Sequence, residues 1–475
     1  MSDKFEEGVA AVMAREFAGF EALLDCSRLT AGASLETYRL KVLIGGVECF
    51  YALRRSPLGG TDTGDVAGIG LDAEARLLQL MGQAGIPEPE IYYVLREEDG
   101  LGGGFFMQWL DGETLGSRIV RSEQLAVVRP QLARQCGEIL ARIHNIDWRT
   151  EGLDQHLMQL TPEQLVHESW NYYQELGLAE PMLDYTARWL LQNLPQNPQI
   201  NLVHGDFRNG NLMVTEAGIT AVLDWEIAHL GDPVRDLGWL CVNSWRFGNT
   251  QLPVGGFGHI EDLLAGYNAV AKVAVTHEQL HYWQVFGSFW WAIACLRMAQ
   301  SWRSGDNPSV ERPAIGRRSS EAQMDCVNLL IPGDFVLPTG ANEAAMETQL
   351  PVLDELLSSV ETFLREEVSA SADPRLAFLS RVAANSIATA RREADYGTEL
   401  AQAEATRLQQ LLNATGDALS LRRQLAVALR QGLALDAPGL AEHMRQTVAG
   451  QLAIDQPRYG ALQVAASRQG ESINE

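Results

Sequence analysis

The chain has 475 residues, which is too many for one ordinary hydrophobic core and suggests two or three domains. Hydrophobic residues make up 46% of the sequence, so wholesale disorder is excluded. With 61 acidic and 37 basic residues the formal net charge is −24, which argues against general nucleic-acid binding but leaves room for a local arginine cluster.

The N-terminal segment and the cysteines favour a cytoplasmic protein. MSDKFEEGVAAVMAREF has the pattern of an acidic amphipathic helix and not of a signal peptide. The most apolar stretch, residues 285–295, is roughly half the length that a membrane span needs. The six cysteines are scattered, without a CxxC pair or a histidine at metal-ligand spacing. We therefore expect reduced thiols, no nucleic-acid partner and no membrane partner.

Residues 27–110 have the pattern of β-strands. TYRLKVLI and VECFYALR, joined by Gly45-Gly46, predict a hairpin. The glycine-rich segment GGTDTGDVAGIG precedes a predicted helix, LDAEARLLQLMGQAG. IPEPEIYYVL and GGFFMQWL predict a second strand pair across a turn-rich segment.

From about residue 115 the hydrophobic period becomes helical. Helices are predicted near residues 123–146, 161–176 and 181–192, short strands at 200–204, 212–215 and 220–224, and mostly helix from there to residue 330. A strand-rich lobe followed by a helix-rich lobe is the bilobal order of protein kinases. Beyond a Pro- and Gly-containing linker, the sequence is rich in Ala, Leu, Arg and Glu and predicts further helices.

These patterns together predict an α+β chain with a bilobal, protein-kinase-like fold followed by an all-α helical domain. The expected parts are a small lobe (1–110), a large lobe (111–335), a linker (336–345), a helical accessory domain (346–466) and a flexible tail (467–475).

The strongest chemical signal is LVHGDFRNGNLMV, followed by ITAVLDWEIAHLGDPVRDLGWL. His204, one residue, Asp206, four residues and then Asn211 reproduce the spacing of the kinase catalytic loop. Phosphoryl transfer requires an aligned hydroxyl, neutralised charge and a fixed metal. Strand-end turns with polar capping residues would explain HGD or LDW if either stood alone. Here the HGDxxxxN spacing, the strand hairpin that follows it and a second aspartate at the next strand end occur together, which favours a catalytic site.

Each of these residue types suits one task. A carboxylate at Asp206 can orient the attacking hydroxyl and accept its proton, and Arg208 can offer positive charge to the transferring phosphoryl oxygens. Asn211 offers a neutral oxygen to Mg²⁺, and Asp224, at the end of ITAVL, offers an anionic one. We expect His204 to be a structural hydrogen-bonding residue. We expect Asp236 to brace the catalytic loop.

With these motifs the chain resembles the aminoglycoside phosphotransferase family, the choline/aminoglycoside kinase-like group. It is similar in particular to the branch whose kinase domain is fused to, or encoded beside, acyl-CoA dehydrogenases. HGDxRxGN, LDWExxxxGDPxxDLG and LARIHNID carry the resemblance, which covers approximately residues 27–330. It implies an ATP- and Mg²⁺-dependent phosphotransferase with an alcohol group as acceptor, in which Asp206 is the base and Asn211 and Asp224 hold Mg²⁺.

The resemblance also indicates how the small lobe binds nucleotide. LTAGASLETYRL is similar to the family's loop over the phosphates, with Gly32 and Ser34 near them, although such a segment can also merely turn the chain before a hairpin. The phosphate-pairing lysine of kinases is replaced by Arg54, as in the acyl-CoA-dehydrogenase-linked branch. We expect Glu74 to form an ion pair with Arg54. The alternative is that Glu74 is a solvent-exposed charge on its helix.

Two further residues, Gln108 and Trp109, fall where the hinge between the lobes should present backbone groups to adenine.

The acceptor is less defined than the reaction. A hydroxyacyl-CoA would require arginines for its phosphates, and Arg303, Arg312, Arg317 and Arg318 form such a cluster, unless they only solvate the surface. The branch favours a hydroxyacyl-CoA acceptor and a functional link to an acyl-CoA dehydrogenase. An aminoglycoside or other small alcohol is the alternative acceptor, and a catalytically silent nucleotide-binding regulator is the alternative function. Residues 346–466 resemble an uncharacterised bacterial domain found beside such kinases.

Overall fold

The computed structural model describes residues 2–29, 35–56, 68–339, 353–371 and 373–468. Gly32, Ser34 and parts of the expected linker and tail therefore lie outside the described residues. The chain divides into two compact units, each of which is discontinuous in sequence. The first contains residues 1–160, 197–241 and 252–277, and the second contains residues 161–196, 242–251 and 278–475.

The helices and strands of each unit follow in chain order. The first unit contains α1 (Ser2–Glu16), β1 (Phe20–Arg28), β2 (Glu36–Ile44), β3 (Val47–Ser56), α2 (Leu71–Gln83), β4 (Ile91–Val94), β5 (Gly103–Gln108), α3 (Gly116–Arg121), α4 (Leu132–His144), β6 (Asn201–Val203), β7 (Leu212–Thr215), β8 (Gly218–Val222), β9 (His229–Gly231), α7 (Val234–Leu240) and α8 (Ile260–Val270). The second contains α5 (Pro162–Glu175), α6 (Pro181–Gln192), α9 (His277–Arg303), α10 (Glu311–Arg317), α11 (Ser319–Leu330), α12 (Leu353–Glu366), α13 (Pro374–Leu412), α14 (Ala418–Arg430), α15 (Leu440–Asp455) and α16 (Gly460–Arg468).

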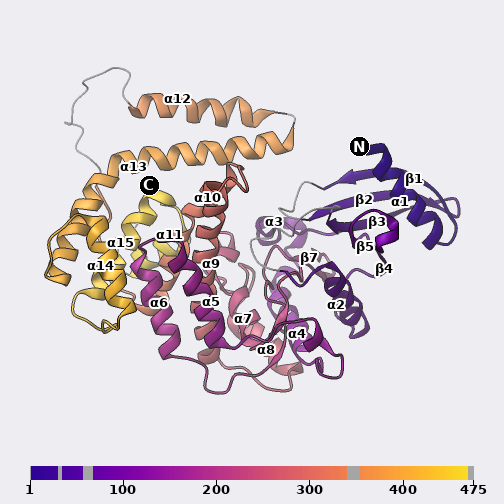
Figure 1. The fold of residues 1–475 in the computed structure, drawn as a ribbon, viewed down its shortest axis with the longest axis horizontal. Helices are drawn as coiled ribbons and strands as arrows, with labels where there is room; N and C mark the ends of the chain where they lie inside the picture. Colours follow the sequence, from indigo (N-terminus) through magenta and orange to yellow (C-terminus); the bar gives the residue numbers. More distant parts are fainter. Residues whose placement is uncertain (1, 30–34, 57–67, 340–352, 372, 469–475) are drawn as a thin grey trace. The chain divides into compact units, whose positions relative to one another are not determined.

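An antiparallel five-stranded sheet, in the order β1-β2-β3-β5-β4, forms the N-terminal part of the first unit (Figure 1). The predicted hairpin is β2–β3, and its turn residues Gly45 and Gly46 have φ values of 56° and 77°. Two consecutive positive φ angles are those of a tight hairpin turn, which explains the glycine pair. Strand β1 lies largely before the region in which the sequence predicted strands.

The core of this sheet is closed by α1. Val9 and Met13 are fully buried in one cluster with Leu40, Leu53 and Phe106 of the sheet. The sequence predicted this helix from its amphipathic pattern, and burying its apolar face against the sheet provides most of its stability.

The rest of the first unit combines short strands with packed helices. Helix α4 crosses α8 so closely that a Cβ at Gly137 would lie 2.2 Å from the carbonyl oxygen of Leu263. The prediction of a single helix over residues 123–146 is wrong for its first part. Only short 3₁₀ turns precede α4, which begins at Leu132. Pro130 has no backbone N–H to donate within a continuous helix.

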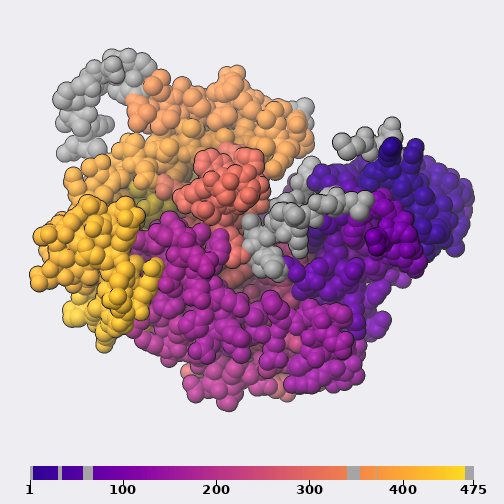
Figure 2. Space-filling model, viewed as in Figure 1, coloured from indigo at the N-terminus to yellow at the C-terminus, as the bar shows by residue number. Residues whose placement is uncertain are grey.

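The second unit is helical. Asp373 caps α13 by accepting hydrogen bonds from the backbone N–H groups of Arg375 (2.8 Å) and Leu376 (3.3 Å), with Pro374 at the first helical position, as the sequence predicted. Helices α12 and α13 run side by side (Figure 1). In the space-filling view the C-terminal helices, in yellow, lie against α6, in magenta (Figure 2). There, Arg430 of α14 donates to the buried Asp184 of α6 at 2.7 Å.

The six cysteines are free thiols, as expected. In the part of the chain that the structure describes, no helix is both long and apolar enough to cross a bilayer.

Candidate active site

The loop that carries Asp206 connects β6 to β7. Its backbone is held in place by hydrogen bonds to Asp236. The two carboxylate oxygens of Asp236 accept hydrogen bonds from the backbone N–H groups of His204 (2.8 Å) and Gly205 (2.9 Å). The Nε2 atom of His144 lies 3.1 Å from the same carboxylate. Burial alone would raise the pKa of Asp236, but the hydrogen bond from His144 and the charges around it lower that pKa to about 2. The expected bracing role of Asp236 is confirmed.

Gly205 makes the turn possible. Its φ is 88°, and a Cβ there would lie 2.5 Å from the carbonyl oxygen of Ile227. Only glycine combines this backbone conformation with this close approach.

His204 is held as a neutral structural residue. Its Nδ1 accepts the backbone N–H of Asp206 at 3.1 Å, its ring packs on Trp225 with centroids 4.4 Å apart, and it is fully buried. Burial lowers its pKa, so the ring carries no charge near neutral pH. This arrangement agrees with a hydrogen-bonding role and leaves Asp206 as the available carboxylate.

The carboxylate of Asp206 is fixed by donors from three side chains. Trp239 Nε1 donates to Oδ1 at 2.7 Å, Asn211 Nδ2 donates to Oδ2 at 2.6 Å, and Arg208 Nε lies 3.0 and 3.2 Å from the two oxygens. Charge-assisted hydrogen bonds of this kind orient an ionised carboxylate and stabilise its charge. Asp206, Arg208 and Asn211, chosen from the sequence, are therefore brought together.

Trp239 was not predicted from the sequence. It lies in α7, three residues after Asp236, in the segment DLGWL. The only signal for it was its position behind the GDPVRD motif, since a tryptophan in an apolar helix usually indicates core packing.

Asp224 lies just beyond the end of β8, next to the catalytic loop. Its φ is 73°, which is uncommon for a residue other than glycine and is best tolerated by Asn and Asp. The preceding residue, Leu223, donates its N–H to the carbonyl oxygen of Asn211 at 2.8 Å. Asn211 and Asp224 therefore lie on two hydrogen-bonded segments at the wall of one cavity.

Arg54 of β3 joins Glu74 of α2 to Asp224. Its Nε lies 3.2 Å from Glu74 Oε1, and its Nη2 donates to Asp224 Oδ1 at 2.9 Å. Burial opposes the charge of Arg54, but the two carboxylates outweigh burial and raise its pKa. The expected Arg54–Glu74 ion pair is present, and the contact with Asp224 is additional.

A cavity of about 610 Å³ extends from these residues beneath the sheet. Its apolar wall includes Ala52, Phe105, Met107 and Leu223, and both Gln108 and Trp109 line it, at the end of β5. This volume lies within the usual range of small-molecule sites, roughly 300–1,000 Å³.

The four arginines proposed for the acceptor all belong to the second unit. Arg317 Nε lies 2.9 Å from Asp455 Oδ1, and Arg318 Nη2 lies 3.1 Å from Glu321 Oε2. Arg303 is exposed and lines a cavity together with Arg317, whereas Arg312 is buried. Arg317 and Arg318 are thus already engaged by carboxylates.

A catalytic loop of kinase spacing, an aspartate at the next strand end and a cleft beneath an antiparallel sheet define a phosphotransferase of the kinase-like class. The profile of the Phosphotransferase enzyme family matches residues 25–272, just over half of the chain. The chain belongs to this family. A second profile, Domain of unknown function (DUF6285), matches residues 370–459, within the predicted accessory domain.

Relatives and a solved structure agree with this assignment. Acyl-CoA dehydrogenase family member 10 from Mus musculus is 28% identical over 180 residues, 36% of this chain and 16% of that protein. Family member 11 from Pongo abelii is 24% identical over 405 residues, 77% of this chain and 48% of that protein. The chain thus spans less than half the length of either relative.

A solved Ralstonia eutropha protein, assigned by name to the aminoglycoside phosphotransferases, superposes with a TM-score of 0.55 at 21% identity, over 67% of this chain and 96% of that one. This likeness concerns the fold. The predicted resemblance, the kinase-like fold with a helical domain and the phosphotransferase class are confirmed.

Proposed function

We propose that this chain is an ATP- and Mg²⁺-dependent kinase that transfers the γ-phosphoryl group to a hydroxyl of a hydroxyacyl-CoA. The observation that carries the proposal is the hydrogen bond between Asn211 and Asp206, with Asp224 on the adjoining segment, beside a cleft large enough for a nucleotide. Phosphoryl transfer is mainly a matter of positioning and charge stabilisation, which such a set supplies.

The residues present fit Mg²⁺. The side-chain nitrogen of Asn211 is engaged by Asp206, which leaves the amide oxygen as its acceptor, and Asp224 adds carboxylate oxygens at the same cavity. Hard oxygen ligands suit Mg²⁺, which is often held by one or two protein groups together with substrate phosphates. When bound, the ion would neutralise phosphate charge.

In the proposed reaction Asp206 accepts the hydrogen bond of the acceptor hydroxyl and takes its proton as the oxygen bonds to the γ-phosphorus. The bond between that phosphorus and its bridging oxygen breaks, and ADP leaves. Arg208, whose Nε contacts Asp206, is assigned to the charge that develops on the transferring phosphoryl oxygens. Arg54 is assigned to the nucleotide phosphates, and the Gln108–Trp109 segment to adenine.

Gly32 and Ser34 remain assigned to the nucleotide phosphates on the sequence alone. The domain boundaries given above likewise remain predictions.

Two observations support a CoA thioester as the acceptor. The relatives bear acyl-CoA dehydrogenase names, and the chain has the arginine set of Arg303, Arg312, Arg317 and Arg318, suited to phosphate anions. Arg317 and Arg318 would exchange their present carboxylate partners for phosphate. The same names support a functional link to an acyl-CoA dehydrogenase.

One assay tests acceptor and reaction together: ATP consumption by the purified chain with short hydroxyacyl-CoAs and with aminoglycosides in parallel. Replacing Arg303 and Arg312 by Ala should raise KM for the acyl-CoA and leave KM for ATP nearly unchanged. Efficient phosphorylation of an aminoglycoside with no turnover of any acyl-CoA contradicts the proposed acceptor. Nucleotide binding without turnover of any alcohol supports the regulator instead.

A further inference from the structure

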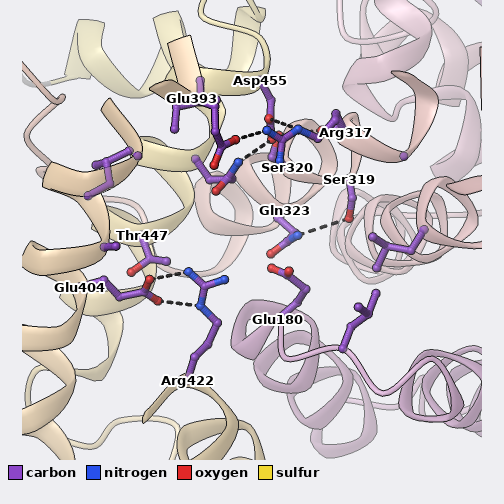
Figure 3. A pocket seen from close by; sticks show the side chains of 18 of the residues that line it. Glu180, Arg317, Ser319, Ser320, Gln323, Glu393, Glu404, Arg422, Thr447 and Asp455 are labelled. Atoms are coloured by element: carbon purple, nitrogen blue, oxygen red, sulfur yellow. Dashed lines mark hydrogen bonds and ion pairs between the residues drawn. The ribbon is translucent and has the colours of Figure 1, made fainter. Parts of the chain in front are cut away.

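The second unit contains a cavity that is distinct from the nucleotide cleft (Figure 3). It has a volume of about 710 Å³, within the usual range of small-molecule sites, and its walls come from α9, α10, α11, α13, α14 and α15. Small side chains keep it open. At Gly397, for example, a Cβ would meet no atom closer than 3.6 Å, the distance to Glu393 Oε1.

Most of the carboxylates in the wall are already neutralised. Arg422 donates to both carboxylate oxygens of Glu404, from Nε to Oε1 at 2.9 Å and from Nη2 to Oε2. Arg317 contacts Asp455 at 2.9 Å and also pairs with Glu393 (Figure 3). These pairs leave the cavity little attraction for a cation.

Two arginines of the wall have no carboxylate within ion-pair distance among the described residues. Arg407 donates from Nη2 to Thr447 Oγ1 at 3.2 Å, while its buried Nε has no hydrogen-bond partner among the described residues. Burial lowers the pKa of Arg407, and the charges of Glu404 and Glu442 offset this effect only in part. Arg303, in the last turn of α9, likewise has no carboxylate within ion-pair distance in the described part of the chain.

One wall carboxylate, Glu180, also lacks an ion pair within the described residues. Its side chain faces Gln323 (Figure 3), and burial raises its pKa, although the charge of Arg422 acts in the opposite direction. The charged side chains of the wall are four carboxylates and four arginines, and among the described residues Arg407 and Arg303 are the arginines that no carboxylate contacts.

His443 provides an independent sign of a polar ligand. It is 2% exposed, and neither ring nitrogen has a hydrogen-bond partner in the described residues. It lines a small side chamber that shares Glu180, Gln323, Arg422 and Thr447 with the main cavity. Burial lowers its pKa to about 3, so the neutral ring offers one donor and one acceptor. Buried polar atoms of this kind are normally satisfied by water or by a ligand.

The remaining wall is apolar and includes Leu296, Leu400 and Ile454. We propose that this cavity is a second binding site, which takes an amphipathic anion: a carboxylate or phosphate head paired with Arg407 and Arg303, and an apolar body against these side chains. Such an anion could be a separate effector or the nucleotide end of the CoA acceptor. The site does not require the proposed kinase activity.

The test is calorimetric titration of the full chain, without ATP, using four probes with one tail: octanoate, octyl phosphate, octanol and octylamine. The two anions should bind at least about tenfold more tightly than octanol, since losing a hydrogen bond to a charged group costs about that factor. Their affinity should fall with added salt. Equal binding of octanol, preferred binding of octylamine, or no binding of either anion overturns the proposal.

Variants locate the site. Arg407→Gln and the exposed Arg303→Gln should each weaken octanoate binding by about tenfold, and Gly397→Leu, which fills the cavity, should abolish it. Arg423→Gln is the matched control, because Arg423 is exposed on α14 and does not line the cavity. Unchanged octanoate binding in both Arg303→Gln and Arg407→Gln overturns the proposal.

Coenzyme A serves as a competitor in the same titration. Displacement of octanoate assigns the cavity to the acceptor's nucleotide end, and absence of displacement assigns it to a separate effector. Because no turnover is measured, failure of the kinase proposal leaves this result unaffected.

Discussion

Arg54 donates a hydrogen bond of 2.9 Å from Nη2 to Oδ1 of Asp224, a residue 170 positions away in the chain. Its Nε is at the same time 3.2 Å from Oε1 of Glu74. One guanidinium therefore ties β3 and α2 to the strand end that carries the proposed metal ligand. The ammonium of a lysine is a point charge on a flexible stem and lacks the planar fork that spans both carboxylates.

We predict that Arg54→Lys weakens nucleotide binding in the presence of Mg²⁺ by about tenfold, and that Arg54→Ala weakens it further. The reason is that each charge-assisted hydrogen bond contributes about 1.5–3 kcal/mol, and lysine retains the charge but loses the fork. Titration calorimetry with ATP measures the effect. Arg28→Lys is the control, because Arg28 is an exposed residue of β1. Wild-type affinity in Arg54→Ala would remove Arg54 from the nucleotide site.

Asp206→Asn should lower turnover by a factor of about 10²–10⁴, the usual contribution of a general base, and leave ATP affinity largely intact. The carboxylate acts on the acceptor hydroxyl, whereas the nucleotide contacts come from other residues. Turnover and nucleotide affinity have to be measured separately. Near wild-type turnover would exclude Asp206 from its assigned role.

Trp239→Phe tests positioning of the same carboxylate. The substitution keeps an aromatic ring in α7 but removes the donor that lies 2.7 Å from Asp206 Oδ1. We expect kcat to fall about tenfold, with ATP affinity unchanged, because a hydrogen bond to a charged group is lost. In the background of Asp206→Asn the same change should have little further effect, since residues acting as one unit are not additive. A full tenfold additional loss in that background would indicate a purely structural role.

Asp224→Ala should abolish Mg²⁺-dependent activity more completely than Asn211→Ala. Asp224 contributes a formal charge to the metal, whereas Asn211 contributes only a dipole. Activity is followed as a function of Mg²⁺ concentration, where Asn211→Ala should regain part of its activity at high Mg²⁺. Equal defects of both variants at saturating Mg²⁺ would contradict the ranking.

The sequence predicted those parts of the site that lie close together along the chain. Asp206, Asn211 and Asp224 fall within one strand–loop–hairpin segment, so their spacing alone indicated their proximity. The Arg54–Glu74 pair was expected from kinase order, although 20 residues separate the two.

The contacts that the sequence did not indicate depend on packing between distant segments. Trp239 reaches Asp206 only because α7 lies beside the catalytic loop, 33 residues further on. Likewise, Arg317 pairs with Glu393 of α13 and with Asp455 of α15, which lie far from it in the sequence. A count of arginines in one segment cannot reveal which carboxylates the fold brings to them.

The last prediction concerns Asp325, which is buried in α11 of the second unit. It accepts hydrogen bonds from Tyr459 Oη at 2.9 Å and Asn243 Nδ2 at 3.1 Å, with Arg246 and Glu321 as the nearby charges. Burial raises its pKa from 3.8 to about 7, against the opposing effects of Tyr459 and Arg246. The folded state therefore binds a proton more tightly than the unfolded state, so this group's contribution to stability falls as pH rises from about 4 to about 7, and is then constant.

Between pH 5.5 and pH 8 we expect the free energy of unfolding to decrease by roughly 2 kcal/mol on account of this group, since one pKa unit corresponds to about 1.4 kcal/mol. Asp325→Asn should remove this part of the pH dependence, because an amide does not titrate, while still offering an acceptor to Tyr459. Urea unfolding at the two pH values measures the difference. Asp395→Asn, an exposed change in α13, is the control and should keep the wild-type slope. Identical pH dependence in wild type and Asp325→Asn would show that Asp325 has an ordinary pKa in the folded protein.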